Sequence, residues 1–329
     1  MDDNKSKLIV FDCDPGIDDA LALCLGISLF RDPIAVITSY GCSEIMNTTK
    51  NARHLLDLLG RQDIPVIRGS AKPLLWPHPI DGRILPTFFG DNGLNNVSLP
   101  ASKITGEIST QHDDVFVEHV AGLLRSVDSI DYYLTGPCTN LAKICLRYPD
   151  LVKEKINRLH IMGGALGSGN SGAKDPYSGQ GVSEFNFYLD PIAVDLVLSL
   201  NLKPRLITWD QAKLFQLSHS EVHSLHGKHE STQYLLKAIR NFFLLYAHDT
   251  VKESEKQSEP FVILSDPIVL MTNHESGHLV EKKVEIVMHG RDFGRSVESP
   301  DGHIVDYFEF VNPSSAMAYM LEGIDAEVC

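Results

Sequence analysis

The sequence lacks the features that would place the chain in a membrane or on a nucleic acid. No stretch reaches the roughly 18 to 20 apolar residues that span a bilayer, and no run of lysines and arginines occurs. Lys and Arg number 29 against 43 Asp and Glu, a net charge of −14. Such a chain repels nucleic-acid backbones and anionic membranes, so neither is an expected partner. The acidic, polar N-terminus is unlike a secretory signal, and we expect a cytoplasmic protein.

Paired cysteine motifs are also missing. The six cysteines are Cys13, Cys24, Cys42, Cys138, Cys145 and Cys329. Without a CxxC pair they form neither a zinc ribbon nor a thioredoxin-type site, and free thiols are expected. Hydrophobic residues make up 43% of the chain and charged residues 22%, which excludes disordered, collagen-like and disulfide-stapled proteins.

The sequence does contain a regular alternation of β-branched runs and helical patterns. Strands are predicted at 8–12, 34–39, 65–68, 130–135, 158–162 and 205–208. Helices are predicted at 18–29, 44–59, 194–200 and 231–248. Because a βαβαβ order places strands parallel, we predict an α/β fold with an open, mostly parallel, Rossmann-like twisted sheet and helices on both faces. No linker interrupts it, so one domain is expected over residues 1–329.

Three segments interrupt this alternation. Residues 69–111 carry five prolines with little periodicity, which makes them a candidate lid. Residues 163–183 contain seven glycines and no apolar period, and no P-loop signature, because GK[ST] is missing. The charged run 251–258 is predicted to be a solvated loop.

The stretch DCDPGIDDA, residues 12–20, follows the first strand and holds four carboxylates. Carboxylates this close repel one another, so a cation or protons must neutralise them. Pro15 and Gly16 favour a turn after the strand, and Asp18 and Asp19 then fall in the first turn of a helix. Oxygen ligands without a nearby His indicate Ca²⁺ or Mg²⁺. The alternative is a set of helix-capping carboxylates without a metal.

Two enzyme classes place an Asp-x-Asp motif after an apolar strand. In haloacid-dehalogenase-type phosphatases Asp12 would be the nucleophile, but Thr or Val usually follows that motif, and the Asp18–Asp19 pair has no role there. DCDPGIDDA instead resembles the N-terminal signature of the inosine-uridine-preferring nucleoside hydrolases. The resemblance continues in order along nearly the whole chain through Asn51-Ala52, Pro65-Val66, Pro73-Leu74, FFGDNGL (88–94), TGPCTNLA (135–142), IMGGA (161–165), SEFNFYLDP (183–191) and SDPIVLM (265–271).

The resemblance implies hydrolysis of ribonucleosides to ribose and a free base with Ca²⁺, in homodimers or homotetramers. It implies carboxylate ligands at Asp14, Asp19 and Asp266 and a backbone-carbonyl ligand at Thr139. Asp14 would also be the general base, because a carboxylate beside a cation-bound water accepts its proton readily. Asp12 would orient the loop.

The same resemblance assigns the ribose contacts. Asp18 would hold one ribose hydroxyl, and Glu184 and Asn186 would hold the others. Asn170 would match a further ribose-binding Asn, although the loop between Asn170 and Glu184 is several residues longer than the family's usual form, so another residue of this loop is an alternative.

Two positions depart from the family pattern. Cys42 replaces an Asn that touches ribose, as in a subset of the family. At the start of a helix its thiol would have a lowered pKa and would exchange a proton near the sugar, and a space-filling role is the alternative. Ser265 replaces a His that protonates the departing base, and a hydroxyl is a poor acid at neutral pH.

Without that His, a purine that stacks on aromatic rings is the better leaving group, so a preference for inosine and guanosine is expected. Candidates for the stack are Phe88, Phe89, Trp76, Tyr246 and Trp209. His248 is a candidate replacement acid. A nucleoside-binding relative that has lost turnover through the changes at 42 and 265 is the non-enzyme alternative.

Overall fold

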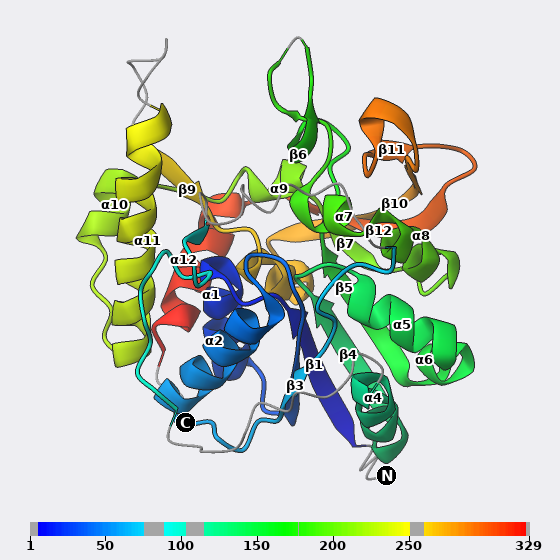
Figure 1. Ribbon diagram of the computed structural model, residues 1–329, viewed down its shortest axis with the longest axis horizontal. Coiled ribbons are helices and arrows are strands. Elements are labelled where there is room, and N and C mark those ends of the chain that lie inside the picture. Colours follow the sequence, from blue (N-terminus) through cyan, green and yellow to red (C-terminus); the bar gives the residue numbers. More distant parts are fainter. Residues whose placement is uncertain (1–5, 76–88, 103–114, 177, 251–259, 327–329) are drawn as a thin grey trace.

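The computed structural model describes residues 6–75, 89–102, 115–176, 178–250 and 260–326, with the backbone alone for 245–250. Within these ranges, nine strands form one sheet in the order β11-β10-β12-β7-β5-β4-β1-β2-β3 (Figure 1). The strands are β1 (Lys7–Cys13), β2 (Ile34–Thr38), β3 (Val66–Arg68), β4 (Ser129–Leu134), β5 (Ile156–Met162), β7 (Arg205–Ile207), β10 (Gly277–Ile286), β11 (Ser296–Glu298) and β12 (His303–Phe310).

The run of strands from β12 to β3 is parallel, whereas β10 pairs antiparallel with both β12 and β11. The predicted α/β fold with a mostly parallel sheet is therefore confirmed. After β1 the chain builds outward through β2 and β3, and it then returns to build the other half from β4. Strand order thus reverses between β1 and β4, the place where open α/β sheets bind ligands.

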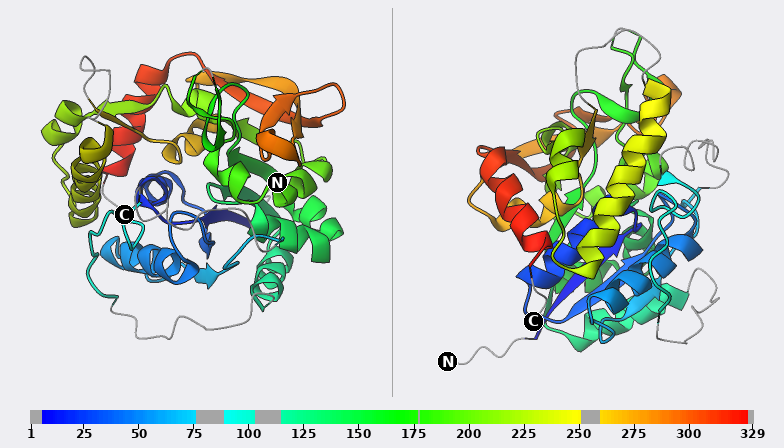
Figure 2. Two further views of the ribbon diagram at one scale, coloured as in Figure 1. Left: turned by 45° about the horizontal axis from the view of Figure 1, so that its top comes forward. Right: turned by 90° about the vertical axis from the view of Figure 1, so that its left-hand side faces the viewer.

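Helices cover both faces of the sheet (Figure 2). The helical elements are α1 (Ile17–Leu29), α2 (Ile45–Leu58), α4 (Val115–Ser126), α5 (Thr139–Arg147), α6 (Pro149–Lys155), α7 (Phe185–Leu189), α8 (Pro191–Ser199), α9 (Trp209–Ala212), α10 (His219–Ser224), α11 (Glu230–Thr250), η1 (Pro267–Asn273), η2 (Gly290–Asp292) and α12 (Pro313–Ile324). No helix among the described residues is both long and apolar enough to cross a membrane.

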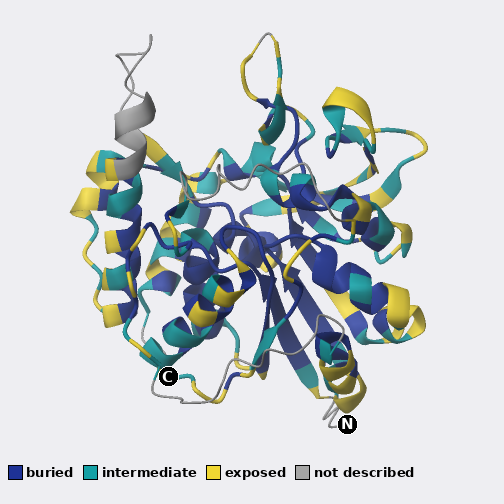
Figure 3. Ribbon diagram, viewed as in Figure 1, coloured by how far each residue is buried: buried dark blue, intermediate teal, exposed yellow. Residues whose placement is uncertain are grey.

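Two apolar cores flank the sheet because successive side chains of a strand point to opposite faces. In β1, Ile9 and Phe11 pack with α1, α2, η1 and α12, whereas Leu8 and Val10 pack with α4, α5 and α8. The central strands are buried on both faces, as parallel strands usually are, and exposed residues lie mainly on the outer helices and loops (Figure 3).

The glycine-rich stretch 163–183 contains regular structure that its sequence did not indicate. β6 (Gly169–Lys174) bridges antiparallel to Gly181 and Ser183. The glycines permit this close pairing, because a Cβ at Gly169 would lie 2.0 Å from the Ser183 carbonyl oxygen. A second small ribbon joins β8 (Gln216–Ser218) to β9 (Phe261–Ile263), just before Asp266. Most of the candidate lid and the run 251–258 lie outside the described residues.

Two helix glycines provide a matched test of this packing. A Cβ at Gly26 in α1 would lie 2.2 Å from Cζ of the buried Phe11, whereas a Cβ at the exposed Gly122 in α4 meets nothing within 4 Å. We expect Gly26→Ala to lower the free energy of unfolding by about 1–3 kcal/mol through overpacking. Gly122→Ala should raise it by about 0.5–1 kcal/mol, because alanine is the better helix former. Urea denaturation measures both values, and equal effects would contradict this description of the core.

Candidate active site

Four carboxylates meet at the carboxyl end of β1. Asp14 follows β1, Asp18 and Asp19 lie in the first turn of α1, and Asp266 precedes η1. Ligand atoms of Asp18, Asp19 and Asp266 lie within 4.8 Å of one another, and so do those of Asp14, Asp19 and Cys42. Asp14, Asp19 and Asp266 are almost fully buried, and Asp18 is half-buried. The structure thus brings together the acidic residues proposed from the sequence, at the reversal of strand order.

Asp14 is held in a cradle of glycines. The Cys42 N–H donates to Asp14 Oδ2 at 2.6 Å. A Cβ at Gly41 would lie 1.9 Å from the same oxygen, and a Cβ at Gly136 would lie 2.8 Å from Oδ1. Only glycine therefore fits at positions 41 and 136 while Asp14 keeps this orientation.

Asp19 and Asp18 are fixed by hydroxyl and backbone donors. Thr135 Oγ1, at the end of β4, donates to Asp19 Oδ1 at 2.6 Å, and the Gly16 N–H donates to Oδ2 at 3.3 Å. Ser265 Oγ donates to Asp18 Oδ2 at 2.7 Å. Thr135 is the first residue of the TGPCTNLA motif, but the sequence did not indicate that its hydroxyl would contact Asp19.

Burial and mutual repulsion disfavour ionisation of the cluster. Burial, followed by neighbouring carboxylates, raises the pKa of Asp14 and Asp266 well above the usual range. Burial also raises the pKa of Asp18, and it raises that of Asp19 to about 8 with a further contribution from Asp18. A divalent cation would remove this penalty, and carboxylate oxygens are the ligands that Ca²⁺ and Mg²⁺ prefer. The donor set therefore fits a hard divalent cation.

Asp12 lies in β1, two residues before Asp14, and is fully buried. Its carboxylate accepts hydrogen bonds from Tyr132 Oη at 2.7 Å and Asn140 Nδ2 at 2.8 Å. Burial raises its pKa to about 7, against these two donors. Both oxygens of Asp12 are therefore engaged, by Tyr132 of β4 and by Asn140 of α5. Tyr132 and Asn140 were not proposed from the sequence.

Glu184 and Asn186 link α7 to the strand ends. Glu184 is the N-cap of α7, and its carboxylate accepts the N–H groups of Gly164, Asn186 and Phe187 at 2.9–3.0 Å. Burial raises its pKa to about 7. Asn186 Nδ2 donates to the Thr135 carbonyl at 2.6 Å. Glu184 thereby contacts the segment after β5 through Gly164, and Asn186 contacts Thr135, whose hydroxyl binds Asp19.

Thr139 and Asn170 have other surroundings. Thr139 begins α5, and its hydroxyl donates to Asp190 at 2.7 Å and contacts Tyr40 Oη at 3.1 Å. Carbonyls in the first turn of a helix point along its axis, toward the following turn. Asn170 is exposed on β6. Within the described contacts, neither residue touches the acidic cluster through its side chain.

The expected low pKa of Cys42 is wrong. The helix that was to lower it begins at Ile45 with Glu44 as N-cap, so the thiol does not lie at a helix start. Burial, followed by Asp14 and Asp18, raises its pKa well above the usual range. The thiol is also tightly packed, because a Cβ at Gly16 would lie 2.8 Å from its Sγ. Cys42 is therefore a neutral thiol beside Asp14.

One aromatic pair lies next to Glu184 and Asn186. The ring centroids of Phe89 and Phe185 are 5.7 Å apart, and Phe185 is the first residue of α7. Trp209 begins α9 and packs partly buried against the core. Trp76 and Phe88, and the side chains of Tyr246 and His248, lie outside the described residues.

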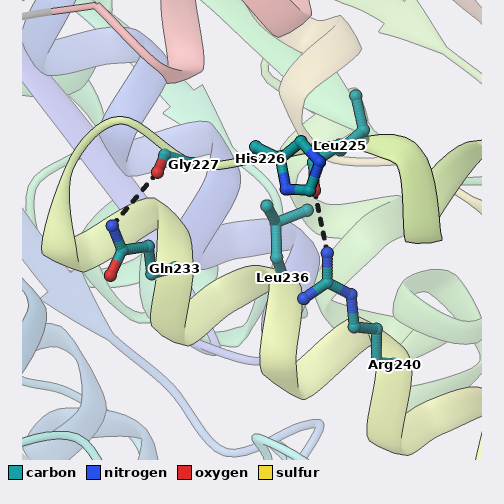
Figure 4. Close-up of a pocket in the computed structure, with 6 residues that line it drawn as sticks. All are labelled: Leu225, His226, Gly227, Gln233, Leu236 and Arg240. Atoms are coloured by element: carbon teal, nitrogen blue, oxygen red, sulfur yellow. Dashed lines mark hydrogen bonds between the residues drawn. The ribbon is translucent and has the colours of Figure 1, made fainter.

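A separate pocket of about 200 Å³ lies where the α10–α11 connection crosses α11 (Figure 4). Arg240 Nη2 donates to the Leu225 carbonyl at 2.8 Å, and Gln233 Nε2 donates to the Gly227 carbonyl at 3.1 Å. These side chains close the turn after α10. None of the acidic residues described above lines this pocket.

Comparisons with known proteins match nearly the whole chain. The sequence model of the inosine-uridine preferring nucleoside hydrolases matches residues 9–328. Pyrimidine-specific ribonucleoside hydrolase RihA of Citrobacter koseri is 30% identical over 323 residues, which cover 97% of this chain and 94% of the relative.

Solved structures share the fold. The plant nucleoside hydrolase PpNRh1 superposes with a TM-score of 0.81 at 21% identity, over 98% of this chain and 99% of that one. The purine-preferring ribonucleoside hydrolase from Gardnerella vaginalis superposes with a TM-score of 0.80 at 19% identity, again over 98% and 99%. At these identities the structures establish the common fold alone.

The raised carboxyl pKa values predict a pH-dependent response to metal. Because the pKa of Asp19 is about 8 and that of Asp12 about 7 in the folded protein, stability is fully present below the unfolded-state values and is lost as pH rises through 7 to 8. We expect EDTA-treated protein to melt at a lower temperature near pH 8 than near pH 5. Added Ca²⁺ should raise the melting temperature more near pH 8. Calorimetry at both pH values checks this, and an equal Ca²⁺ effect would contradict it.

Proposed function

The chain belongs to the inosine-uridine preferring nucleoside hydrolase family, and on that basis we propose that it hydrolyses the N-glycosidic bond of ribonucleosides, with Ca²⁺ as cofactor. The observation that carries this proposal is the buried group of Asp14, Asp18, Asp19 and Asp266 at the reversal of strand order. The products would be ribose and a free base.

We assign Asp14 as the general base. Its carboxylate is oriented by the Cys42 N–H and by the close backbone of Gly41 and Gly136. When bound, the cation supplies the positive charge that allows these carboxylates to ionise and that acidifies water beside them. Asp14 would then accept the proton of the water that attacks C1′ of the sugar.

Asp18, Glu184 and Asn186 are assigned to the ribose hydroxyls. They come from α1 and from the N-terminal end of α7, and these two elements are fixed in place through Ser265, the α7 N-cap and the Thr135 carbonyl. The transition state of glycoside hydrolysis resembles an oxocarbenium ion, so preorganised negative charge around the sugar favours it. Cys42, as a neutral thiol, would contribute hydrogen bonding or shape beside the sugar.

The backbone-carbonyl ligand is better assigned to Thr135 than to Thr139. Thr135 directly follows β4. Its hydroxyl donates to Asp19 at 2.6 Å, and its carbonyl accepts a hydrogen bond from Asn186 Nδ2 at 2.6 Å. Thr139 begins α5, and its hydroxyl donates a hydrogen bond to Asp190 instead. The proposed ligand set is therefore Asp14, Asp19, Asp266 and the Thr135 carbonyl.

The base-binding side supports a purine preference. The Ser265 hydroxyl donates a hydrogen bond to Asp18, so its O–H is not directed at a leaving base. The Phe89–Phe185 pair beside Asn186 provides aromatic surface on which a purine can stack. The relative at 30% identity is named as pyrimidine-specific, which makes base choice the sharpest test of this part of the proposal.

Replacing the proposed base tests the catalytic assignment. Asp14→Asn should lower kcat on inosine by about 10²- to 10⁴-fold, the usual contribution of general acid–base catalysis, because an amide cannot take up the proton. Release of reducing sugar measures the rate, and circular dichroism confirms folding. Asp195→Asn is the control, because Asp195 on α8 is partly exposed and its ion pair among the described residues is with His303 at 3.0 Å. Full activity of Asp14→Asn would remove Asp14 from the reaction.

A nucleoside panel tests base preference. We expect kcat/KM for inosine and guanosine to exceed that for uridine and cytidine by at least roughly 10²-fold, because position 265 supplies no acid for a pyrimidine. Reducing-sugar release from the five common ribonucleosides measures it. Comparable values for uridine and inosine would show that another group protonates the base. No release from any of them would overturn the proposed hydrolase activity itself.

A further inference from the structure

Ser265 contacts the site through one neighbour. Its hydroxyl is buried, with the residue 8% exposed, and donates to Asp18 Oδ2 at 2.7 Å. The two residues are 247 positions apart in sequence, so this hydrogen bond joins the first turn of α1 to the segment that delivers Asp266.

The backbone on both sides of Ser265 is anchored. The Leu264 N–H donates to the carbonyl of the fully buried Phe215 at 3.0 Å. The Phe215 ring packs edge-on against Phe310, with centroids 4.5 Å apart. After Asp266, residues 267–272 of η1 are buried. The Ser265 hydroxyl is thus presented to Asp18 from a rigid position.

Asp18 lies beside two other carboxylates, and the Ser265 hydroxyl is a donor that reaches it from a distant element. Asp19 and Asp266 have carboxylate oxygens within 4.8 Å of that of Asp18. Asp18 is half-buried, so repulsion can turn its side chain outward toward solvent. The Ser265 hydroxyl on Oδ2 fixes the plane of the carboxylate, so that a ligand would meet it in one orientation.

We propose that Ser265 is a positioning residue, which holds Asp18 in the orientation that binds a ribose hydroxyl and takes no part in protonating the base. This inference rests on the proposed hydrolase function and deepens it. It also gives position 265 a role without a histidine: the Ser265 hydroxyl orients Asp18, which binds the ribose and not the base.

Modified sugars and paired variants test the inference. Ser265→Ala should lower kcat/KM on inosine by about 10- to 100-fold, the range for losing a hydrogen bond to a charged group. On whichever of 2′-deoxyinosine or 3′-deoxyinosine lacks the hydroxyl that Asp18 contacts, the loss should shrink to within about twofold. In an Asp18→Ala background, Ser265→Ala should likewise add no more than about twofold. Ser265→Thr, which keeps the hydroxyl, should restore most of the activity.

A general structural defect is measured separately. The Ca²⁺ affinity, measured by calorimetry, and the melting temperature of Ser265→Ala should stay near those of the wild type, since the proposed carboxylate ligands Asp14, Asp19 and Asp266 remain. Ser28→Ala is the matched control, because the Ser28 hydroxyl on α1 donates to the Leu25 carbonyl at 2.8 Å, outside the acidic cluster. It should leave all of these values unchanged.

The outcomes separate the two proposals. If the wild type releases sugar and Ser265→Ala loses the same factor on inosine and on both deoxyinosines, Ser265 does not act through Asp18 and the inference fails alone. A Ca²⁺ affinity that falls with activity also overturns it, because Ser265 would then support Asp266. If the wild type releases no sugar, the hydrolase proposal fails, and calorimetric ribose binding decides the Ser265 role: unchanged binding in Ser265→Ala overturns it.

Discussion

Repulsion among like charges is the constraint on which this structure depends. Asp14, Asp18, Asp19 and Asp266 meet at the carboxyl end of β1, where the burial of three of them and the partial burial of Asp18 limit screening by water. The surrounding chain supplies neutral donors to three of them: a backbone N–H to Asp14, a threonine hydroxyl to Asp19 and a serine hydroxyl to Asp18. These donors orient the carboxylates, but only a cation or protons can balance their charge.

The parallel sheet makes this corner possible. Strand order reverses between β1 and β4, so the chain leaves those two strands in opposite directions and opens a gap above their ends. The gap receives Asp14 from one side and Thr135 from the other, while Gly41 and Gly136 bring the backbone close around Asp14. Beneath it, Asp12 is bonded to Tyr132 and Asn140 and ties β1 to β4 and α5.

The local sequence was sufficient to predict those site residues that stand close together in the chain. Asp14, Asp18 and Asp19 lie within one turn of chain after an evident strand, so their convergence followed from strand and helix geometry, whereas Asp266 required a family resemblance because nothing local relates it to β1. Contacts across the fold were not predictable: Thr135 with Asp19 and Ser265 with Asp18 depend on packing between distant segments. The pKa of Cys42 was misjudged for two reasons. The helix after β2 begins at Ile45, three residues beyond the thiol, and four nearby carboxylates raise the pKa of the thiol.

The separation of Asp266 from the other three carboxylates has a consequence for biosynthesis. Asp14, Asp18 and Asp19 are synthesised near the start of the chain, but Asp266, which completes the acidic group, follows only after most of the chain has been made. Contacts between such distant positions form late in folding because closing a long loop is slow. On a ribosome, the nascent chain would therefore carry an incomplete ligand set, and metal loading would coincide with the last stage of maturation.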